Sequence, residues 1–453
     1  MLSKIQKHQL QEILSTTEVA RLLCKLNLIG ETYLVGGVPR DLFSEKKLGD
    51  FDLTINASPK ELLRLLAEDN FKVYETGLKH GTITVNLNGR NIEITSFRKV
   101  AADGKVISGN NLAEDLKARD FTINAIAINP FTYEVIDPEG GINDLKNNLL
   151  KACGDPKARL LEDPLRIMRM IRFGPAADRK IDPTLAQTAS LIADKLKDVS
   201  SERVREEFSK ILLAPSKSIR ASFMAMRQIG ILQTILPEIV PSFDFEQNKF
   251  HTEDVFEHTI TVIANAPPEL KLRLAALFHD LGKPASLLVD ERGERHFYNH
   301  EIISESLAAQ AMARLKYSKD LIKKVTLLVR LHMRPLDCGP AGVRRLMRDL
   351  GEEFETWQEF KIADKPPVFP NDDIHLRIQR FRELASSEIA RLTKSNPFKL
   401  AVNGEELKKI GFKQGRELGS CLKELKELVL DQPELNTKES LIKIAKEKLD
   451  QIT

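Results

Sequence analysis

Two aspartates separated by one residue, Asp50 and Asp52, lie in an apolar run shortly after the glycine pair Gly36 and Gly37. If that run forms a strand, both carboxylates point to the same face, because residues two apart in a strand share a face. Convergent carboxylates supply the oxygen ligands of Mg²⁺, which proteins usually bind together with substrate phosphates. The spacing therefore predicts a Mg²⁺ site that acts on a phosphate-bearing substrate.

The residues before these aspartates predict a cradle for the phosphates. Residues 33–35 have the pattern of a short buried strand, and the glycine pair that follows lets the backbone approach a ligand closely. Arg40 and Asp41 would lie at the start of a helix, where free N–H groups favour phosphate. The alternative without a function is a glycine turn beside a solvated acidic loop. The joint presence of all these residues disfavours that alternative.

A further pair, Asp163 and Arg166, is spaced for direct recognition of a base. On a helix, residues three apart are neighbours on one face. The carboxylate can accept from the amino group of cytosine or adenine, and the Arg fork can donate to ring acceptors. A helix-stabilising ion pair is the alternative. Arg166, Arg169 and Arg172 also form a basic ridge suited to a triphosphate or an RNA backbone.

Histidines and aspartates between residues 252 and 364 form a second constellation, centred on an adjacent His-Asp pair at the end of an apolar helix. Imidazole and carboxylate groups are ligands for one or two divalent transition metals. A metal held there could activate water for phosphoester hydrolysis. Histidines with purely structural roles are the alternative. The candidate ligands are His258, His279, Asp280 and Asp364, with His300 and His332 as further candidates.

The elements expected around these residues divide the chain into a strand-rich first third and a helical remainder. Residues 1–30 have the pattern of an amphipathic helix. Residues 81–87 alternate as a half-buried strand, which returns through a tight turn at Asn88 and Gly89 as residues 91–97. From residue 155 onward the pattern is helical.

The composition describes a globular protein of several domains. The chain has 453 residues, of which 42% are apolar and 29% charged, and its net charge is only +3. Any nucleic-acid surface must therefore come from local clusters of Lys and Arg. The four cysteines lie far apart, without metal spacing or a disulfide framework, which predicts a reducing cytoplasm. The charged N-terminus predicts neither a signal peptide nor a membrane span.

The run Gly36-Gly37-x-x-Arg40-Asp41 with Asp50-x-Asp52 resembles motif A of the class II nucleotidyltransferases. These are the tRNA CCA-adding enzymes and bacterial poly(A) polymerases of the DNA polymerase beta superfamily. The resemblance implies a polymerase-beta-like α/β head, with a mixed sheet and helices, followed by an all-α neck, an HD body and a tail that binds tRNA. The implied boundaries are 1–150 for the head, 151–240 for the neck, 241–370 for the HD domain and 371–453 for the tail.

Other motifs of that family follow in order along the chain. Arg119-Asp120-Phe-Thr-Ile-Asn124 is similar to motif B, although Ala118 replaces a second arginine, and a helix cap at Asp120 is the alternative. Glu162-Asp163-Pro-Leu-Arg166 matches motif D, and residues 201–212 resemble the neck helix of motif E. The His and Asp set resembles the HD phosphohydrolase family.

The resemblance implies a role for each matching residue. Asp50, Asp52 and Glu93 would be the catalytic carboxylates, with Mg²⁺ on the two aspartates; a solvated glutamate is the alternative for Glu93. The HD residues would hold a transition-metal cation. Residues that would bind the nucleotide are Gly36, Gly37, Arg40, Asp41, Arg119, Asp120, Asn124, Asp163, Arg166 and Arg169.

The implied function is a Mg²⁺-dependent tRNA nucleotidyltransferase that adds CCA, or part of it, to the tRNA 3′ end. It would use CTP and ATP without a template and release pyrophosphate, with no membrane and no obligate protein partner. Addition of CC only and addition of A only are alternatives, and the first is favoured by residues 99–118, which lack the Asp-x-Arg-x-Pro-like stretch of the family's flexible loop. A poly(A) polymerase is disfavoured. An HD phosphohydrolase with a nucleotide-binding head is another alternative, whereas the Asp50-x-Asp52 pair argues against a non-catalytic RNA-binding protein.

Overall fold

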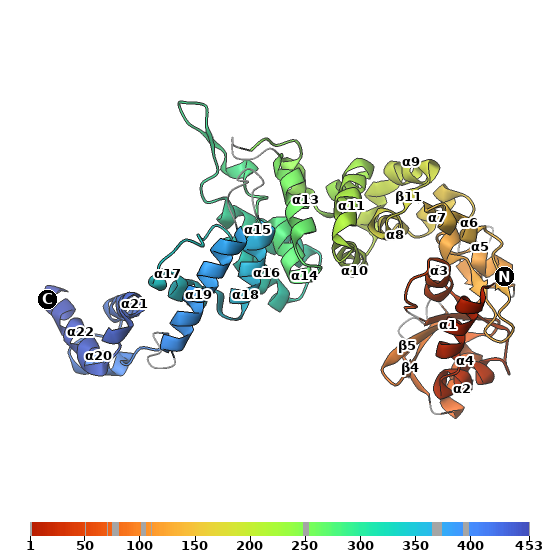
Figure 1. Ribbon diagram of the computed structural model, residues 1–453, viewed down its shortest axis with the longest axis horizontal. Helices are drawn as coiled ribbons and strands as arrows, with labels where there is room; N and C mark the ends of the chain where they lie inside the picture. The colour runs from red at the N-terminus through yellow and green to blue at the C-terminus, as the bar shows by residue number, and fades with distance from the viewer. Residues whose placement is uncertain are drawn as a thin grey trace. The chain divides into compact units, whose positions relative to one another are not determined.

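The protein is described here by a computed structural model, which divides into two compact units, Met1–Pro237 and Glu238–Thr453 (Figure 1). Each unit is considered by itself. The residues whose structure is described are 2–49, 51–69, 71–74, 81–100, 106–109, 111–247, 253–364, 374–392 and 398–452.

A seven-stranded mixed sheet forms the head of the first unit, in the order β3-β4-β5-β2-β1-β8-β9. Strands β2 and β5 are parallel neighbours, and the other adjacent pairs are antiparallel. The predicted mixed sheet is therefore confirmed, as is the hairpin that β4 and β5 make through Asn88 and Gly89. The strands are β1 (Thr32–Val35), β2 (Phe51–Ile55), β3 (Lys72–Tyr74), β4 (Thr82–Leu87), β5 (Arg90–Ser96), β8 (Ala127–Ile128) and β9 (Val135–Ile136).

The two faces of this sheet differ because its central strands alternate apolar and polar residues. One face carries Leu34, Leu53 and Ile94, which belong to a core shared with buried residues of α1 (Lys4–Leu14), α2 (Thr17–Leu26) and α4 (Pro59–Glu68). The period of two then places Asp52 and Glu93 on the opposite face. The sheet thus separates a dry core from a polar surface.

The N-terminal segment consists of two helices, so the prediction of one amphipathic helix over residues 1–30 was wrong. Helix α1 ends at Leu14, and Thr16 has the extended backbone of an N-cap before α2. The Thr16 hydroxyl donates to the Ile13 carbonyl, 3.1 Å away, at this break. Buried leucines recur on both sides of the break, which is why the sequence pattern reads as continuous.

Beyond the sheet the first unit is helical, apart from short strand pairs. Strands β6 (Arg98–Val100) and β7 (Val106–Ser108) pair with each other, as do β10 (Leu149–Leu150) and β11 (Lys180–Ile181). The helices are α3 (Gly37–Phe43), α5 (Leu112–Lys117), η2 (Thr122–Asn124), α6 (Gly141–Lys146), α7 (Pro156–Glu162), α8 (Arg166–Phe173), η3 (Pro175–Ala177), α9 (Pro183–Ile192), η4 (Ala193–Asp198), α10 (Ser201–Leu212), α11 (Ser216–Ile229) and α12 (Ile231–Ile235). The short helix η5 (Pro237–Ser242) begins at the last residue of this unit and continues into the second.

The second unit is almost entirely helical, as expected for the HD body and tail. Its one strand pair is the short hairpin of β12 (Leu288–Val289) and β13 (Arg295–His296) among the residues described. The helices are α13 (Val255–Asn265), α14 (Leu270–Phe278), η6 (Pro284–Ser286), α15 (His300–Arg314), α16 (Lys319–Leu331), α17 (Pro340–Leu350), η7 (Gly351–Glu353), α18 (Phe354–Ala363), α19 (Ile374–Leu392), α20 (Gly404–Lys409), α21 (Arg416–Asp431), η8 (Pro433–Leu435) and α22 (Lys438–Ile452).

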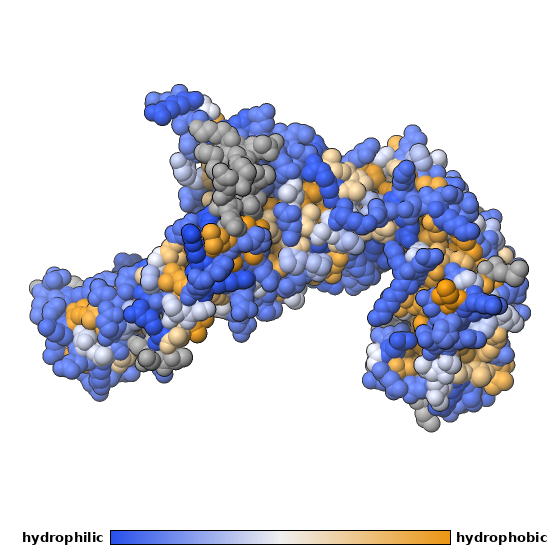
Figure 2. Space-filling model, viewed as in Figure 1, coloured by the Kyte–Doolittle hydropathy of each residue, from blue (hydrophilic) through white to orange (hydrophobic). Residues whose placement is uncertain are grey.

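Apolar side chains are concentrated inside both units. The face drawn in Figure 2 is mostly hydrophilic, with apolar residues in small scattered groups. Within the described ranges, every helix is too short or too polar to span a lipid bilayer.

Candidate functional site

The polar face of the head sheet lines a cavity of about 760 Å³. Asp52 on β2 and Glu93 on β5 are register partners on adjacent parallel strands, and both line this cavity. The fold therefore brings these two predicted carboxylates together. Asp50, the other predicted carboxylate, lies outside the described residues.

Gly36 brings the backbone against Asp52 at the edge of the cavity. Its φ is +67°, and a Cβ built on it would lie 2.7 Å from Oδ2 of Asp52. A residue other than glycine would meet both backbone strain and this clash. Gly36 thus lets the backbone lie close to the Asp52 carboxylate. The sequence predicted a close approach of the backbone at this glycine pair, but to a ligand.

Helix α3 begins at Gly37, so Arg40 and Asp41 lie in its middle and not at its start, contrary to the prediction. Both residues still line the cavity. Arg40 donates from Nε to Asp41 Oδ1 and from Nη1 to Asn124 Oδ1, each at 3.0 Å. These bonds orient the guanidinium at the cavity wall.

The motif B residues form a connected network in the same wall. Asp120 is 6% exposed; it accepts from Asn124 Nδ2 at 3.0 Å and from Arg169 Nε at 2.7 Å. Burial opposes ionisation of Asp120, but the charge of Arg169 and the Asn124 bond outweigh it and lower the pKa of the carboxyl. Asp120 therefore stays charged and fixes two neighbours of the cavity.

A buried aspartate that the sequence did not single out organises the next part of the wall. Asp115 is fully buried and accepts from Arg119 Nη2 at 3.1 Å and from Arg98 Nε at 3.3 Å. Burial opposes its charged form, but Arg119 and Arg98 lower its pKa. The signal that could have found it is the spacing of Asp115 and Arg119, which lie four residues apart across the C-terminal end of α5.

Asp163 and Arg166 do not share one helix, so that prediction was wrong. Asp163 has an extended backbone just after α7, and α8 begins at Arg166. Pro164 disfavours the helical conformation at the residue before it, which breaks the helix at Asp163. Both side chains nevertheless line the cavity. Arg166 donates to Glu162 Oε2 at 2.5 Å, an ion pair within motif D.

Two residues of α10 hold this region in place. Arg203 binds Asp163 through two bonds, of 3.2 and 2.8 Å, and Glu207 accepts from Arg172 Nε at 2.6 Å. The basic ridge of α8 is therefore partly neutralised. Sequence reasoning treated this neck helix as structural and missed Arg203 as a cavity residue.

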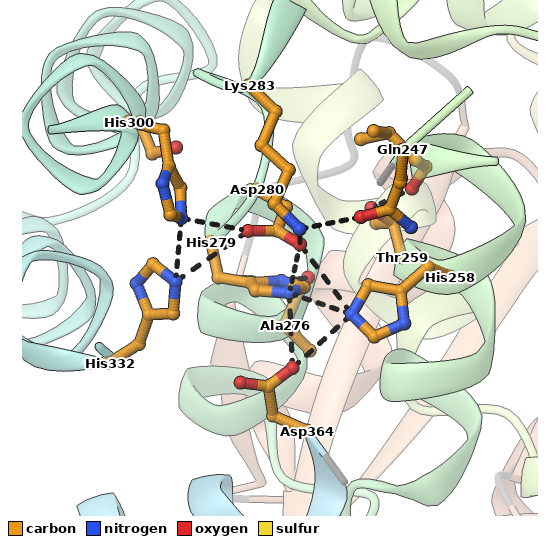
Figure 3. Close-up of polar contacts among 12 residues, drawn as sticks. Gln247, His258, Thr259, Ala276, His279, Asp280, Lys283, His300, His332 and Asp364 are labelled. Atoms are coloured by element: carbon orange, nitrogen blue, oxygen red, sulfur yellow. Dashed lines mark hydrogen bonds and ion pairs between the residues drawn. The ribbon is translucent and has the colours of Figure 1, made fainter. Parts of the chain in front are cut away.

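The second unit assembles all six predicted HD residues around one point (Figure 3). The ligand atoms of two groups each lie within 4.8 Å of one another: His258, His279 and Asp364 in one group, and Asp280, His300 and His332 in the other. Five of the six residues are almost fully buried, and Asp364 is partly buried. Two adjacent sites for metal cations are thus geometrically possible.

Asp280 lies between the two groups and faces both. Its Oδ2 is 3.1 Å from His279 Nε2, while its Oδ1 is 3.2 Å from His300 Nε2. Lys283 also contacts Asp280 Oδ2, at 2.6 Å, and donates to Gln247 Oε1 (Figure 3). A carboxylate placed in this way can bridge two cations.

Backbone carbonyls orient three of the imidazoles. Nδ1 of His279 donates to Ala276 O at 2.8 Å, and Nδ1 of His300 and of His332 donates to a carbonyl in the same way, at 2.7 and 2.6 Å. Each ring therefore presents Nε2 to the centre as a potential ligand. Burial opposes a charged His279, but Asp280 and Asp364 raise its pKa to about 10. A metal would have to displace that proton.

Gly282 allows two parts of this centre to pack closely. A Cβ there would lie 2.3 Å from the His300 carbonyl oxygen and 2.8 Å from the Ser304 nitrogen. Its N–H donates to Ser304 Oγ at 2.9 Å. The segment that carries His279 and Asp280 is thereby held against the first turn of α15.

Comparisons with known proteins match the chain in three segments. The Poly A polymerase head domain matches residues 32–151, a probable RNA- and SrmB-binding site of polymerase A matches residues 180–242, and the HD domain matches residues 255–356. A CCA-adding enzyme of Geobacillus sp. is 30% identical over 412 residues, which cover 88% of this chain and 87% of that protein. The chain belongs to the CCA-adding enzyme family.

Other family members share parts of the chain or its fold. An A-adding tRNA nucleotidyltransferase of Deinococcus radiodurans is 32% identical over 266 residues, covering 56% of this chain and 60% of that protein. The structure of the Bacillus stearothermophilus CCA-adding enzyme in complex with CTP matches with a TM-score of 0.72 at 23% identity, over 96% of this chain and 97% of that one. The predicted fold and enzyme class are therefore confirmed: this is a nucleotidyltransferase, in a family that generally uses a divalent metal.

Proposed function

We propose that this CCA-adding enzyme family member builds the complete CCA end of tRNA from CTP and ATP, and releases pyrophosphate. The observation that carries the proposal is the register pair of Asp52 and Glu93 in a cavity whose wall also carries the arginine network, Asp163 and Arg166. Support for the complete product comes from the Geobacillus relative, which is named a CCA-adding enzyme and matches most of the chain.

Asp52 and Glu93, together with Asp50, would hold Mg²⁺. The donor set fits this cation, because the two described members offer carboxylate oxygens from adjacent strands and face a cavity. When bound, the cation would neutralise and orient the triphosphate. Arg40, Arg119 and Arg169 would bind phosphate and ribose oxygens around it, in positions fixed by their bonds to carboxylates and to Asn124.

Selection between cytosine and adenine would fall to Asp163 and Arg166. Asp163 would accept from the exocyclic amino group that both bases carry, and Arg166 would donate to ring acceptors. The pair with Glu162 limits the directions that the Arg166 fork can take. Because no nucleic-acid strand needs to pair with the incoming base, these two side chains would act in place of a template.

An assay of product length tests this proposal. Purified full-length protein is given tRNAs that lack the whole CCA end, or only its terminal A, with CTP and ATP together, one of them labelled. Complete addition predicts three added nucleotides on the first substrate and one on the second. Addition that stops after CC would favour the CC-only alternative raised by residues 99–118, whereas no incorporation would refute the nucleotidyltransferase function.

We further propose how the chain is organised around this reaction. The head (1–150) would catalyse transfer, and the neck (151–240) would select the nucleotide and bind RNA. The tail (371–453), after the HD domain (241–370), would bind tRNA. A cytoplasmic location is supported by the four cysteines, none of which is paired in the described structure.

A second proposed activity is metal-dependent phosphoester hydrolysis at the HD centre. It is supported by the two ligand groups, which are linked by the contacts of Asp280 with His279 and His300, and by the three imidazoles oriented through Nδ1. Imidazole and carboxylate donors fit transition-metal cations better than Mg²⁺. Metal content and hydrolysis of a phosphodiester by the intact protein, compared with Asp280→Asn, test this activity separately from nucleotide addition.

A further inference from the structure

The polar face of the head sheet continues beyond Asp52 and Glu93 to one edge of the sheet. On this face Glu93 of β5 is the register partner of Thr84 on β4, and Thr84 is the partner of Tyr74 on β3. The row from Asp52 to Tyr74 therefore crosses four adjacent strands and ends at the edge strand β3. Because adjacent strands lie about 4.8 Å apart, the Cα atoms of Glu93 and Tyr74 are about 10 Å apart.

A second row of polar side chains runs beside the first, two residues further along each strand. Asn91 of β5 is the register partner of Asn86 on β4, which is the partner of Lys72 on β3. The residues between them, such as Val85 and Val73, belong to the core on the other face or pack against it. The two rows thus share one face, and their members outside the carboxylate pair are here called the edge strip: Lys72, Tyr74, Thr84, Asn86 and Asn91.

The edge strip offers an exposed aromatic ring, a cation and amide groups. Tyr74 is 40% exposed, and the Lys72 ammonium lies 5.5 Å from the centre of its ring. Asn86 Nδ2 donates to Asn91 Oδ1 at 2.6 Å, and Asn91 Nδ2 has no acceptor in the described part of the chain. Glu93 is the single acid in strands β3, β4 and β5. This combination suits single-stranded nucleic acid, whose bases stack on aromatic rings while basic and polar side chains follow the backbone.

The order of the strands places the edge strip opposite the phosphate-binding side of the carboxylates. Asp52 is the register partner of Val35 on β1, which is followed by Gly36 and α3 with the proposed phosphate ligand Arg40. Strand β1 lies on one side of β2, and β5, β4 and β3 lie on the other. In phosphoryl transfer the attacking and leaving oxygens lie roughly in line, on opposite sides of phosphorus. A hydroxyl that attacks the triphosphate would therefore come from the side of the edge strip.

We propose that the edge strip binds the single-stranded 3′ end of the tRNA substrate, with a base stacked on Tyr74 and the backbone beside Lys72 and Asn91. The assignment to tRNA rests on the proposed function, which requires the tRNA 3′-hydroxyl to reach Asp52 and Glu93. Asn91 also lines the cavity of the head, so the strip and the cavity form one continuous surface, whereas Tyr74 and Lys72 lie outside the cavity lining. The strip is thus a subsite for the RNA end, separate from the residues proposed to hold the incoming nucleotide.

Steady-state incorporation of CTP by the full-length protein, onto a tRNA that lacks CCA, tests the inference. Tyr74→Ala should raise the KM for tRNA about tenfold through loss of one stacked base, and it should leave the KM for CTP unchanged. Tyr74→Phe keeps the ring and should behave as the parent. The control is Phe131→Ala, which removes an exposed aromatic ring between β8 and β9, at the other edge of the sheet.

Binding measurements locate the contact on the RNA. Tyr74→Ala should weaken binding of a tRNA that ends in CC about tenfold, and it should not affect a tRNA trimmed to the last base pair of its acceptor stem. Lys72→Gln should lower the slope of log K against log salt by about 0.7 for the first tRNA. Lys60→Gln, at an exposed position of α4 on the other face of the sheet, should leave this slope unchanged.

Equal weakening for both tRNAs, or equal loss in Tyr74→Phe, would overturn the stacked 3′ end. A raised KM for CTP with an unchanged KM for tRNA would assign the strip to the incoming nucleotide and overturn RNA as its occupant. An active parent protein with unaltered kinetics in Tyr74→Ala would refute the edge strip alone. A parent protein that binds tRNA but adds no nucleotide would instead refute the proposed function.

Discussion

The cavity of the head and the HD centre both gather carboxylates, but they surround these carboxylates with different basic side chains. In the head, Asp115, Asp120 and Asp163 each bind an arginine, and the guanidiniums line an open cavity. In the HD centre, Asp280 and Asp364 face imidazoles whose Nε2 atoms converge on one buried point. The first arrangement suits a large anion and the second a small cation.

The difference shows how neighbours decide the use of the same side chain. An arginine keeps its charge at all relevant pH values, so a carboxylate paired with it becomes a fixed part of a positive wall. An imidazole can release its proton and donate a lone pair, so a carboxylate beside it can share a metal. Two independent activities are therefore expected, which substitutions should separate.

The largest expected effect is the loss of nucleotide addition in Asp52→Asn. Neutralising a carboxylate that would hold Mg²⁺ should lower incorporation of labelled CTP into tRNA by about 10³-fold or more. Hydrolysis at the HD centre should be unchanged. Asp194→Asn, at an exposed position of the same unit, is the control. Full incorporation by Asp52→Asn would contradict the assignment of nucleotide addition to the cavity of the head.

The reciprocal change, Asp280→Asn, should affect only the HD centre. Because both ligand groups contact this carboxylate, bound transition metal and phosphodiester hydrolysis should fall by about 10²-fold or more. Nucleotide addition should continue at the parent rate. The control is Asp320→Asn, an exposed acid of α16. Metal content, phosphodiester hydrolysis and nucleotide addition are measured on one preparation. A joint loss of the two activities would show that they do not depend on separate sites.

Gly36→Ala should reduce nucleotide addition by about 10–100-fold. The new Cβ would displace the Asp52 carboxylate and strain the backbone, at a cost of about 1–3 kcal/mol. Gly89→Ala separates the two effects, because Gly89 also has positive φ, +85°, but nothing lies within 4 Å of its Cβ position. If both variants lost activity equally, strain alone would explain the result and the contact with Asp52 would not matter.

Arg203→Lys should have a smaller effect, of about tenfold on the KM for nucleotide. The lysine keeps the charge but loses the two-bond fork that holds Asp163. We expect reduced discrimination between CTP and ATP on a tRNA that lacks only the terminal A. Arg64→Lys, in an exposed pair on α4, should change nothing. Unaltered discrimination would show that Asp163 needs no such support.

The smallest effect is expected in the acid stability of the first unit. The pKa of Asp120 is lowered in the folded state, below the unfolded value of about 3.9. Its stabilisation is therefore fully present above that value and is lost as the pH falls. Asp120→Asn should destabilise the unit by about 1–3 kcal/mol at pH 7 and flatten the decline between pH 5 and 2. Urea unfolding across this range, with Asp194→Asn as control, measures both.

The sequence predicted best the features that depend on short-range periodicity. The alternation in residues 81–97 is sufficient to predict the β4–β5 hairpin, and the period of two places Glu93 beside Asp52 once the strands are paired. The order of the HD residues similarly predicted their convergence. These patterns predict the structure because each one depends on which face of an element is buried.

What the sequence did not predict depends on contacts between distant residues or on local breaks. Asp163 was assigned to a helix because its spacing to Arg166 fits one, yet Pro164 ends α7 before it. The pairs of Asp115 with Arg98 and of Asp163 with Arg203 span 17 and 40 residues. The break at Thr16 is hidden because leucines continue on both sides.

Gly282 helps to position the HD residues independently of any bound cation. Its backbone contact with α15 fixes the spacing between the His279–Asp280 segment and His300 by main-chain packing. Because this spacing does not depend on a cation, the metal binding proposed for the centre would exchange protons for metal at His279, Asp280 and His300 in the positions that they already occupy. Replacement of this glycine would force the two segments apart. Binding of the proposed cation would then require a rearrangement of the centre, which would lower the affinity for the cation.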